Sequence, residues 1–540
     1  MRFIQLDIRK PARESKAKKK KKQTTEKRER EREREKKIKI RPFNNHRINI
    51  FYYQQKTMVA SLEVDANPEF KTKLSELILE SSGKQPIYLT KVEVNGGEQF
   101  SNNFFEKLLA PILKSGDFTL EDLIAKIGDS KDKLKRTEVF KDVEVSLQPD
   151  NYTLIPSKIK NYNSEKSIPT KAVFNLKQHI LNINESFFNF NNEEYLNLKL
   201  NHFNKNFNEN AESVAVGVDY NPYKPFDHLI ANCRLVSSLK NPSFKFLMDF
   251  NYGQENNEIW QGTKQEILGG KIGILFNHLK SVQVFTGFEL FKRNLHNLDD
   301  SNPDGFKFFD GEFLKTSIVN QINYTKYEYL NEVTKNFPTK GYEVSLKSQL
   351  ASNQEQSNAG NRGEFFKTDF GVKFHQSLFR NFFTAKLQAN VGGIYSFNSK
   401  FPIHPSDKFY LGGYNSFPGF TKNSVDLTGG DQYYKVQGTL YSKIPSFFYT
   451  PSKNSHEDNP LRIYGTGIIG NIVNTSSNKT IIDDENGVVS YGVGLRYFNN
   501  WANFDIGYYI SRRFGGDNSN TNGIKDGLQF SVSIGGSNRF

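Results

Sequence analysis

The sequence predicts an all-β transmembrane barrel of about sixteen antiparallel strands, preceded by one α+β domain of βααββ order. From Glu194 onward, apolar and polar residues alternate in segments of about nine to eleven residues, the length of a tilted strand that crosses a bilayer. No run of about eighteen apolar residues occurs, which excludes a transmembrane helix. It does not exclude a barrel, because barrel strands need apolar residues only at alternate positions.

The composition is consistent with this fold class, although a hydrophobic content of 36% would usually indicate a water-soluble protein of several domains. Aromatic residues make up 14% of the chain, with 47 Phe and 25 Tyr. Aromatic rings favour strands and gather at membrane interfaces, so their excess favours a barrel over a helical protein.

The net charge of +14 comes from the N-terminus, because residues 1–60 hold 21 Lys or Arg against 7 Asp or Glu, and the rest of the chain holds 52 of each sign. We expect residues 1–60 to be a disordered basic tail and residues 61–85 to be a linker with a short helix. An RNA-binding or lipid-binding arm is the alternative. We expect no nucleic-acid partner, and Met58 is a candidate start of the mature chain.

Few residues in this chain form patterns that point to chemistry. Cys233 is the only cysteine, which excludes an internal disulfide, and the nine histidines show no ligand spacing. The segment GTGIIG at 465–470 matches a dinucleotide fingerprint, but strand-like residues follow it where a helix is required, so we assign it to the barrel wall. We therefore expect no metal site, no cofactor and no enzymatic activity.

The α+β domain is predicted for residues 86–179. Strands are expected in IYLTKVEVNG, VFKDVEVSLQ and TKAVFNLKQ. Between the first two, one helix buries Phe104, Phe105, Leu108, Leu109 and Ile112. A second helix begins after Thr119, with Asp122 at capping-box spacing and an apolar stripe of Leu120, Leu123, Ile124 and Ile127.

The barrel is predicted for residues 190–540. Apolar and polar residues alternate clearly in strands such as FKFLMDFNY and TAKLQANVGG, and the weakest candidate strand lies between Gln254 and Gln265. A soluble β-sandwich is the alternative fold. We expect EEYLNLKLNHF to be the first strand, and its candidate gate residues are Tyr195, Leu196, Leu198 and Leu200. We expect Gly535 and Gly536 to shorten and weaken the last strand, DGLQFSVSI, where it meets the first.

The stretch YLGGYNSFPGF lies in an interval of roughly 35 residues between two strands, too long for a simple hairpin, and such loops are usually functional. It resembles the loop motif of the outer-membrane assembly factors, in which Leu-Gly-Gly and a spacer precede Arg-Gly-Phe. The matching residues and the departure are Leu411, Gly412, Gly413, Phe417, Pro418, Gly419 and Phe420. The resemblance implies a loop folded into the lumen, but Pro418 replaces the expected arginine, which leaves the usual ionic docking of the loop in doubt.

Lys525, Gly527, Phe530 and Val532 in the last strand resemble the mitochondrial β-signal, and residues 86–179 resemble a polypeptide-transport-associated (POTRA) domain. Together with the loop, these features resemble the barrel subunit of the mitochondrial sorting and assembly machinery, a member of the outer-membrane assembly factor (bacterial surface antigen) superfamily. The plastid and bacterial relatives carry additional POTRA domains.

The resemblance implies an ATP-independent insertase of the mitochondrial outer membrane. It would fold and insert β-barrel precursors through a lateral gate between its first and last strands, with the POTRA domain in the intermembrane space. The implied partners are unfolded β-barrel precursors, membrane lipids and accessory outer-membrane subunits. A passive channel, or a plastid or bacterial assembly factor, is the alternative.

Overall fold

The computed structural model describes residues 80–151, 167–193, 195–257, 262–278, 281–296, 304–329, 337–357, 360–379, 381–398, 400–444, 460–474, 487–499, 501–514 and 523–537. The predicted tail of residues 1–60, including Met58, and residues 61–79 of the predicted linker lie outside these ranges. The chain divides into two compact units, Met1–His179 and Ile180–Phe540. Each unit is described by itself below.

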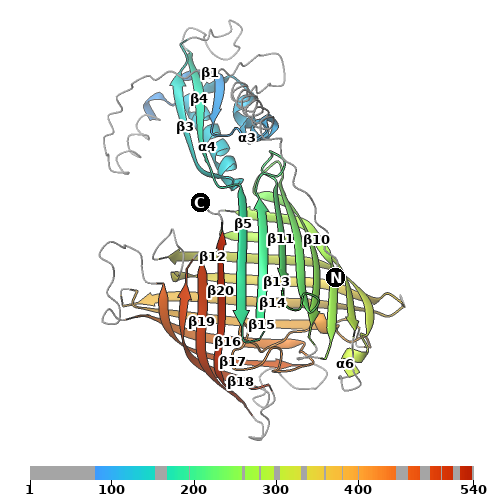
Figure 1. The fold of residues 1–540 in the computed structure, drawn as a ribbon. Coiled ribbons are helices and arrows are strands. Elements are labelled where there is room, and N and C mark those ends of the chain that lie inside the picture. The colour runs from blue at the N-terminus through green and yellow to red at the C-terminus, as the bar shows by residue number, and fades with distance from the viewer. Residues whose placement is uncertain are drawn as a thin grey trace, which may run out of the picture. The chain divides into compact units, whose positions relative to one another are not determined.

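Among its described residues, the first unit contains a four-stranded mixed sheet and the helices α3 and α4 (Figure 1). The elements are β1 (Pro86–Asn95), α3 (Asn102–Leu113), β2 (Asp117–Thr119), α4 (Leu120–Arg136), β3 (Phe140–Pro149) and β4 (Ile168–Gln178). The sheet order is β2-β1-β4-β3, with β1 parallel to β4 and the other pairs antiparallel. The three predicted strands and both predicted helices are present, and the short strand β2 is an addition.

The helices of this unit follow the predicted patterns with one difference. All five apolar residues expected on one face of α3 are buried. The Thr119 hydroxyl accepts a hydrogen bond from the Asp122 amide at 3.2 Å and so caps α4 as expected. The predicted stripe of α4 is wrong at Ile124, which is 38% exposed, because the buried face continues instead through Ser130 and Leu134.

The second unit is a closed barrel of sixteen antiparallel strands, which confirms the predicted fold class (Figure 1). The strands are β5 (Asn182–Asn191), β6 (Tyr195–Asn204), β7 (Ser213–Tyr220), β8 (His228–Ser238), β9 (Phe244–Asn256), β10 (Lys264–His278), β11 (Val282–His296), β12 (Gly311–Tyr329), β13 (Pro338–Glu355), β14 (Arg362–Leu378), β15 (Phe383–Ser396), β16 (Gln432–Lys443), β17 (Leu461–Val473), β18 (Val488–Phe498), β19 (Ala502–Arg513) and β20 (Gly527–Ser537). A short helix, α6 (Asp304–Lys307), precedes β12. The GTGIIG segment lies inside β17, as expected for the barrel wall.

The predicted start of the barrel is wrong by one strand. The first barrel strand is β5, and the strand that begins at Tyr195 is the second. The alternation of β5 is hard to recognise because Asn182, Asn184 and Ser186 occupy the outer face before Phe188 and Phe190 continue it. Among the described residues, the weak candidate between Gln254 and Gln265 is divided between β9, which extends to Asn256, and β10, which begins at Lys264, and residues 258–261 lie outside the described ranges.

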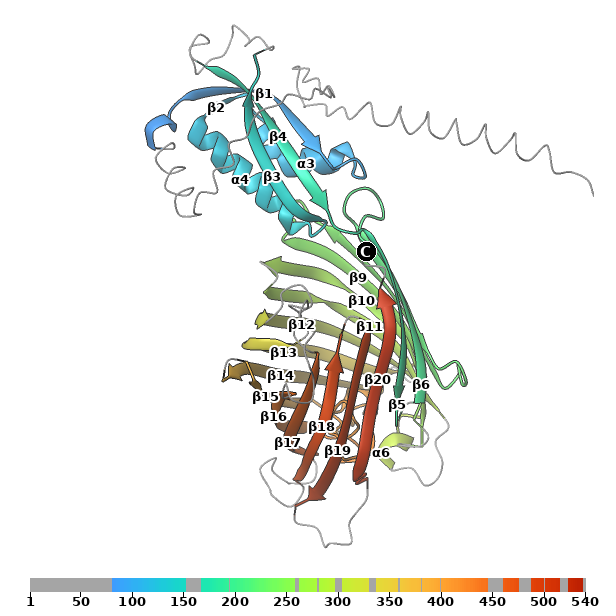
Figure 2. The ribbon, with the colours of Figure 1, turned by 60° about the vertical axis from the view of Figure 1, so that its left-hand side comes forward.

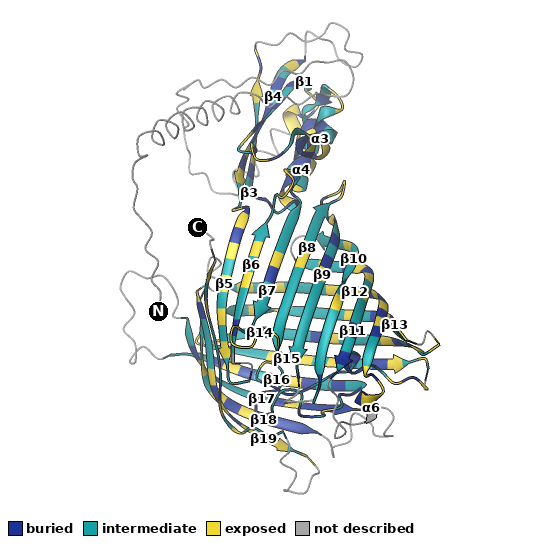
Figure 3. Cartoon of the chain, turned by 45° about the vertical axis from the view of Figure 1, so that its right-hand side comes forward, coloured by how far each residue is buried: buried dark blue, intermediate teal, exposed yellow. Residues whose placement is uncertain are grey.

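The outer face of the barrel carries large apolar side chains, and the inner face carries polar ones. Phe288 on β11 is 64% exposed and Leu387 on β15 is 56% exposed, whereas Asp249 on β9 and Gln349 on β13 are buried. Figure 3 shows that the outside of β8–β13 is mostly intermediate or exposed. A wall with this polarity is the reverse of a water-soluble protein and suits hydrocarbon outside and water inside. Among the described residues, no helix is both long and apolar enough to cross a membrane.

Candidate functional site

The segment 400–431 between β15 and β16, which we call the lumenal loop, folds back against the inner wall of the barrel. It buries apolar side chains against inward-facing residues of β13–β18. The loop contributes Phe409, Leu411, Phe417, Phe420 and Val425, and the wall contributes Ala351, Phe365, Ile394, Tyr433, Ile468, Ile472 and Val488. Phe417 and Phe420 are completely buried, and each buried phenylalanine stabilises the docked loop by about 1.5–3 kcal/mol.

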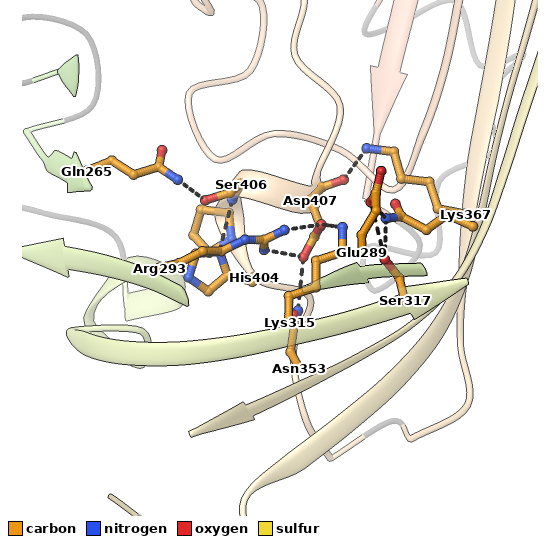
Figure 4. A network of polar contacts seen from close by, with 12 residues as sticks. Gln265, Glu289, Arg293, Lys315, Ser317, Asn353, Lys367, His404, Ser406 and Asp407 are labelled. Atoms are coloured by element: carbon orange, nitrogen blue, oxygen red, sulfur yellow. Dashed lines mark hydrogen bonds and ion pairs between the residues drawn. The ribbon is translucent and has the colours of Figure 1, made fainter. Parts of the chain in front are cut away.

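One residue, Asp407, anchors the start of the loop to four consecutive strands through its carboxylate and its backbone carbonyl (Figure 4). Asp407 lies in the short helix η1 (Pro405–Asp407). Its carboxylate accepts hydrogen bonds from Nη1 and Nη2 of Arg293 on β11, at 2.6 and 2.9 Å. Lys315 on β12 donates to the same carboxylate at 2.5 Å, and Asn353 on β13 at 2.9 Å. Lys367 on β14 donates to the Asp407 carbonyl at 2.6 Å. Fork-like pairing of arginine with carboxylate gives both strength and fixed geometry.

The lumenal loop is docked by ion pairs although Pro418 carries no charge. Asp407 supplies the anion on the loop, and Arg293 and Lys315 supply the cations on the wall. Complete burial by itself raises the pKa of Asp407, but Arg293 and Lys315 outweigh burial and hold this pKa well below its usual range. The carboxylate is therefore ionised where it lies.

The glycines of the motif permit close packing of the loop tip. Gly419 has φ of +92°, and a Cβ there would lie 1.8 Å from the Ser511 hydroxyl oxygen on β19. Gly412 has φ of +123°, and its Cβ would lie 2.3 Å from the Thr421 carbonyl oxygen. Glycine is required at both positions, because other residues rarely adopt these angles and have no space for a side chain.

The barrel closes where its last strand meets its first, and we call the β5–β20 ladder the seam (Figure 2). Residue pairs run from Asn191–Ser531 to Glu185–Ser537. All other neighbouring strands in the barrel are consecutive in the chain, so the seam alone is held without a chain connection. The β6–β7 ladder is similarly short, so the missing connection, rather than length, distinguishes the seam.

Two expectations about the seam are wrong. Tyr195, Leu196, Leu198 and Leu200 lie on β6, which pairs with β5 and β7, so they are one strand away from the seam. Gly535 and Gly536 do not shorten the last strand, because β20 continues through both to Ser537 and both pair with β5.

The predicted β-signal residues do lie at the seam. Phe530 and Val532 are on the outer face of β20, and the Phe530 ring lies 5.4 Å from the Phe190 ring across the seam. Gly527 begins β20 with φ of +119°, an angle that favours glycine. Lys525 precedes the strand, and its Nζ donates to the Asn192 carbonyl, just beyond the end of β5, at 3.3 Å.

The loop motif and the last strand come together, and the loop also contacts the first strand's side of the seam. The Lys525 amide donates to the Gly419 carbonyl at 2.8 Å, and the Gly419 amide donates to Gln529 Oε1 at 3.2 Å. On the other side, the Tyr414 amide donates to a Glu193 carboxylate oxygen at 3.0 Å. The lumenal loop thus links the wall of β11–β14 to both sides of the seam.

Sequence reasoning missed Asp407, Asn192 and Glu193. A signal for Asp407 existed, because inward positions on β11, β12 and β14 carry Arg293, Lys315 and Lys367 and need a counter-charge. No equivalent signal identifies Asn192 and Glu193, since their contacts depend on where the seam closes. Among the described residues, no three His, Cys, Asp or Glu side chains are placed to hold a metal ion.

Comparisons with known proteins support the fold. No family model matches the chain, and no curated protein matches its sequence. Among solved structures, it is similar to BamA from Haemophilus ducreyi lacking POTRA domains 1–3, with a TM-score of 0.65, 13% identity, and coverage of 87% of this chain and 94% of that one. It is also similar to CdiB from Acinetobacter baumannii, with a TM-score of 0.50, 14% identity, and coverage of 84% and 74%.

Proposed function

We propose that this protein is an insertase that folds β-barrel precursors and inserts them into the mitochondrial outer membrane through the seam. The observation that carries the proposal is the contact of the lumenal loop with both sides of the one strand pair that has no chain connection. Such a loop can hold the seam closed or release it. The likeness in fold to BamA supports an assembly role, and the β-signal pattern at the last strand supports the mitochondrial assignment.

An opened seam would solve the main physical problem of inserting a barrel. A partly folded barrel has unpaired strand edges, and each unsatisfied backbone group in hydrocarbon costs several kcal/mol. If β5 and β20 part, their exposed edges can pair with a precursor strand and satisfy it before it enters lipid. No nucleotide is needed, because folding and burial of the precursor drive the reaction.

The α+β unit has a role in this scheme. Strand β3 is at one end of its sheet order, so its outer edge has no partner strand among the described residues. Such an edge can accept an extended precursor segment through main-chain hydrogen bonds. We place this unit in the intermembrane space, where precursors would reach it before the barrel. Accessory outer-membrane subunits are further proposed partners.

The experiment that tests the proposal locks the seam. In a Cys233→Ser background, cysteines at Asn189 and Ser533, which are opposite each other on β5 and β20, form a disulfide across the seam. The matched control pairs Ser533 with Asn503 on β19, which joins strands that are already consecutive in the chain. The purified proteins are reconstituted in liposomes, and insertion of an unfolded mitochondrial porin is measured by protease protection.

We expect oxidation of the seam lock to abolish porin insertion and reduction to restore it, while the control inserts porin in both states. Equal insertion by the oxidised seam lock and the control would reject the insertase proposal. Ion conductance without insertion would favour the passive channel.

A further inference from the structure

A polar cavity of about 270 Å³ lies inside the barrel between the tip of the lumenal loop and the wall of β15–β20, and we call it the basic chamber. The loop contributes Tyr414, Asn415, Ser416 and Pro418 to its lining. The wall contributes three cations, Lys386, Lys435 and Arg496, and one anion, Asp505. The volume is just below the roughly 300–1,000 Å³ of pockets for drug-sized ligands, so it suits a small ion with its water molecules.

The positive charges of the chamber are not balanced by its own residues. Asp505 accepts a hydrogen bond from the Tyr464 hydroxyl at 2.7 Å and lies 3.9 Å from Arg496. Lys373, a fourth cation near the chamber, is paired with Glu343 at 2.8 Å and so adds little net charge. Two ammonium groups, those of Lys386 and Lys435, therefore face the chamber without an ion pair to a carboxylate among the described residues; Glu343 and Asp369 act on them only from further away.

Lys386 differs from the other cations of the chamber. Lys435 donates to the Ser416 carbonyl at 3.0 Å, and Arg496 donates to the Tyr441 hydroxyl at 3.2 Å. The Lys386 ammonium group makes no hydrogen bond to any other described residue, and the positive charges of Arg496 and Lys435 act on it together with the Lys373–Glu343 ion pair. Gathering like charges in a partly dry site is unfavourable unless an anion joins them.

We propose that the basic chamber binds a small oxyanion, a phosphate or carboxylate group, with Lys386 as its principal ligand. Lys435 and Arg496 have remaining donors that can contact the same anion, and the hydroxyl groups of Tyr464 and Tyr441 line the same cavity. Because Tyr414 to Pro418 form one side of the chamber, a bound anion would also hold the loop tip in place. The two sources of this chemistry are free phosphate and a carboxylate of a polypeptide.

The test uses the full chain, purified in detergent, and inorganic phosphate as the probe. Binding is measured by titration calorimetry, with chloride at matched ionic strength as the reference. We expect phosphate to bind with measurable heat, and Lys386→Gln to weaken binding by about 10- to 150-fold, the effect of removing one charged hydrogen bond. Lys386→Arg should retain binding, and Lys199→Gln, which removes an inward-facing lysine of β6, should bind as the unchanged protein does.

Two further arms identify the source. If a short peptide with a free carboxyl terminus competes with phosphate and its carboxamide form does not, the natural ligand of the site is a polypeptide carboxylate. Lack of competition by either peptide assigns the site to free phosphate. If phosphate has no more effect than chloride, or if Lys386→Gln binds phosphate as the unchanged protein does, the chamber holds only water and the inference is wrong. These results are independent of porin insertion, so they do not depend on the proposed function.

Discussion

Asp407→Asn is expected to release the lumenal loop from the wall of β11–β14. The substitution removes the charge that balances Arg293 and Lys315, whose side chains are only 7% and 6% exposed. Removing one partner of a buried ion pair typically costs about 3–5 kcal/mol, because the remaining charge is left uncompensated. With about 1.4 kcal/mol for each tenfold change, the population of undocked loop should rise roughly 100- to 4,000-fold.

The measurement is hydrogen exchange of the backbone amides of residues 404–430 in the detergent-solubilised protein. Exchange of these amides in Asp407→Asn should accelerate by the same factor, while the strands of the wall remain protected. Asp426→Asn is the matched control, because Asp426 lies in the same loop and its carboxylate accepts hydrogen bonds from the nearby Thr428. Equally slow exchange in Asp407→Asn and the unchanged protein would refute the anchoring role of this carboxylate.

Three more predictions concern the loop and the seam. Gly419→Ala should displace the loop tip and increase its protease sensitivity, because the added Cβ would overlap the Ser511 hydroxyl, whereas Gly393→Ala, with open space around its Cβ, should not. The Asp407 carboxylate stabilises the docked loop fully above its unfolded-state pKa, near 3.8, and this stabilisation is lost only as the pH falls through the lower folded-state pKa. Protection of the loop amides from hydrogen exchange should therefore persist from pH 7 to pH 4. Lys525→Met should raise hydrogen exchange at the end of the seam near Asn192, because the substitution removes one hydrogen bond across the seam. Unchanged exchange there would show that this hydrogen bond does not hold the seam.

The sequence predicted the barrel and the loop because both depend on local patterns. Alternation along strands such as β9 and β15 reflects a wall with lipid-compatible and polar faces, and the structure confirms it. The glycine and aromatic positions of the loop motif are visible in the sequence because glycine is required wherever φ is strongly positive, as at Gly412 and Gly419.

The contacts that close the site could not be predicted in the same way. Strand β5 escaped detection because asparagines interrupt its outer face, and the gate was therefore assigned to β6. The pairing of Asp407 with Arg293 joins residues separated by 114 positions, and that of Glu193 with the Tyr414 amide joins residues separated by 221 positions. Such contacts depend on barrel closure, a property of the whole chain rather than of any segment.

The most direct test of the central claim is site-specific photo-crosslinking during insertion of a β-barrel precursor. A photoreactive amino acid is placed at Asn189 on β5, at Ser533 on β20, or at Ser345 on β13 as a control in the opposite wall. We expect adducts with the last strand of the precursor at Asn189 and Ser533 and none at Ser345. Adducts at Ser345, with none at the two seam positions, would contradict this expectation.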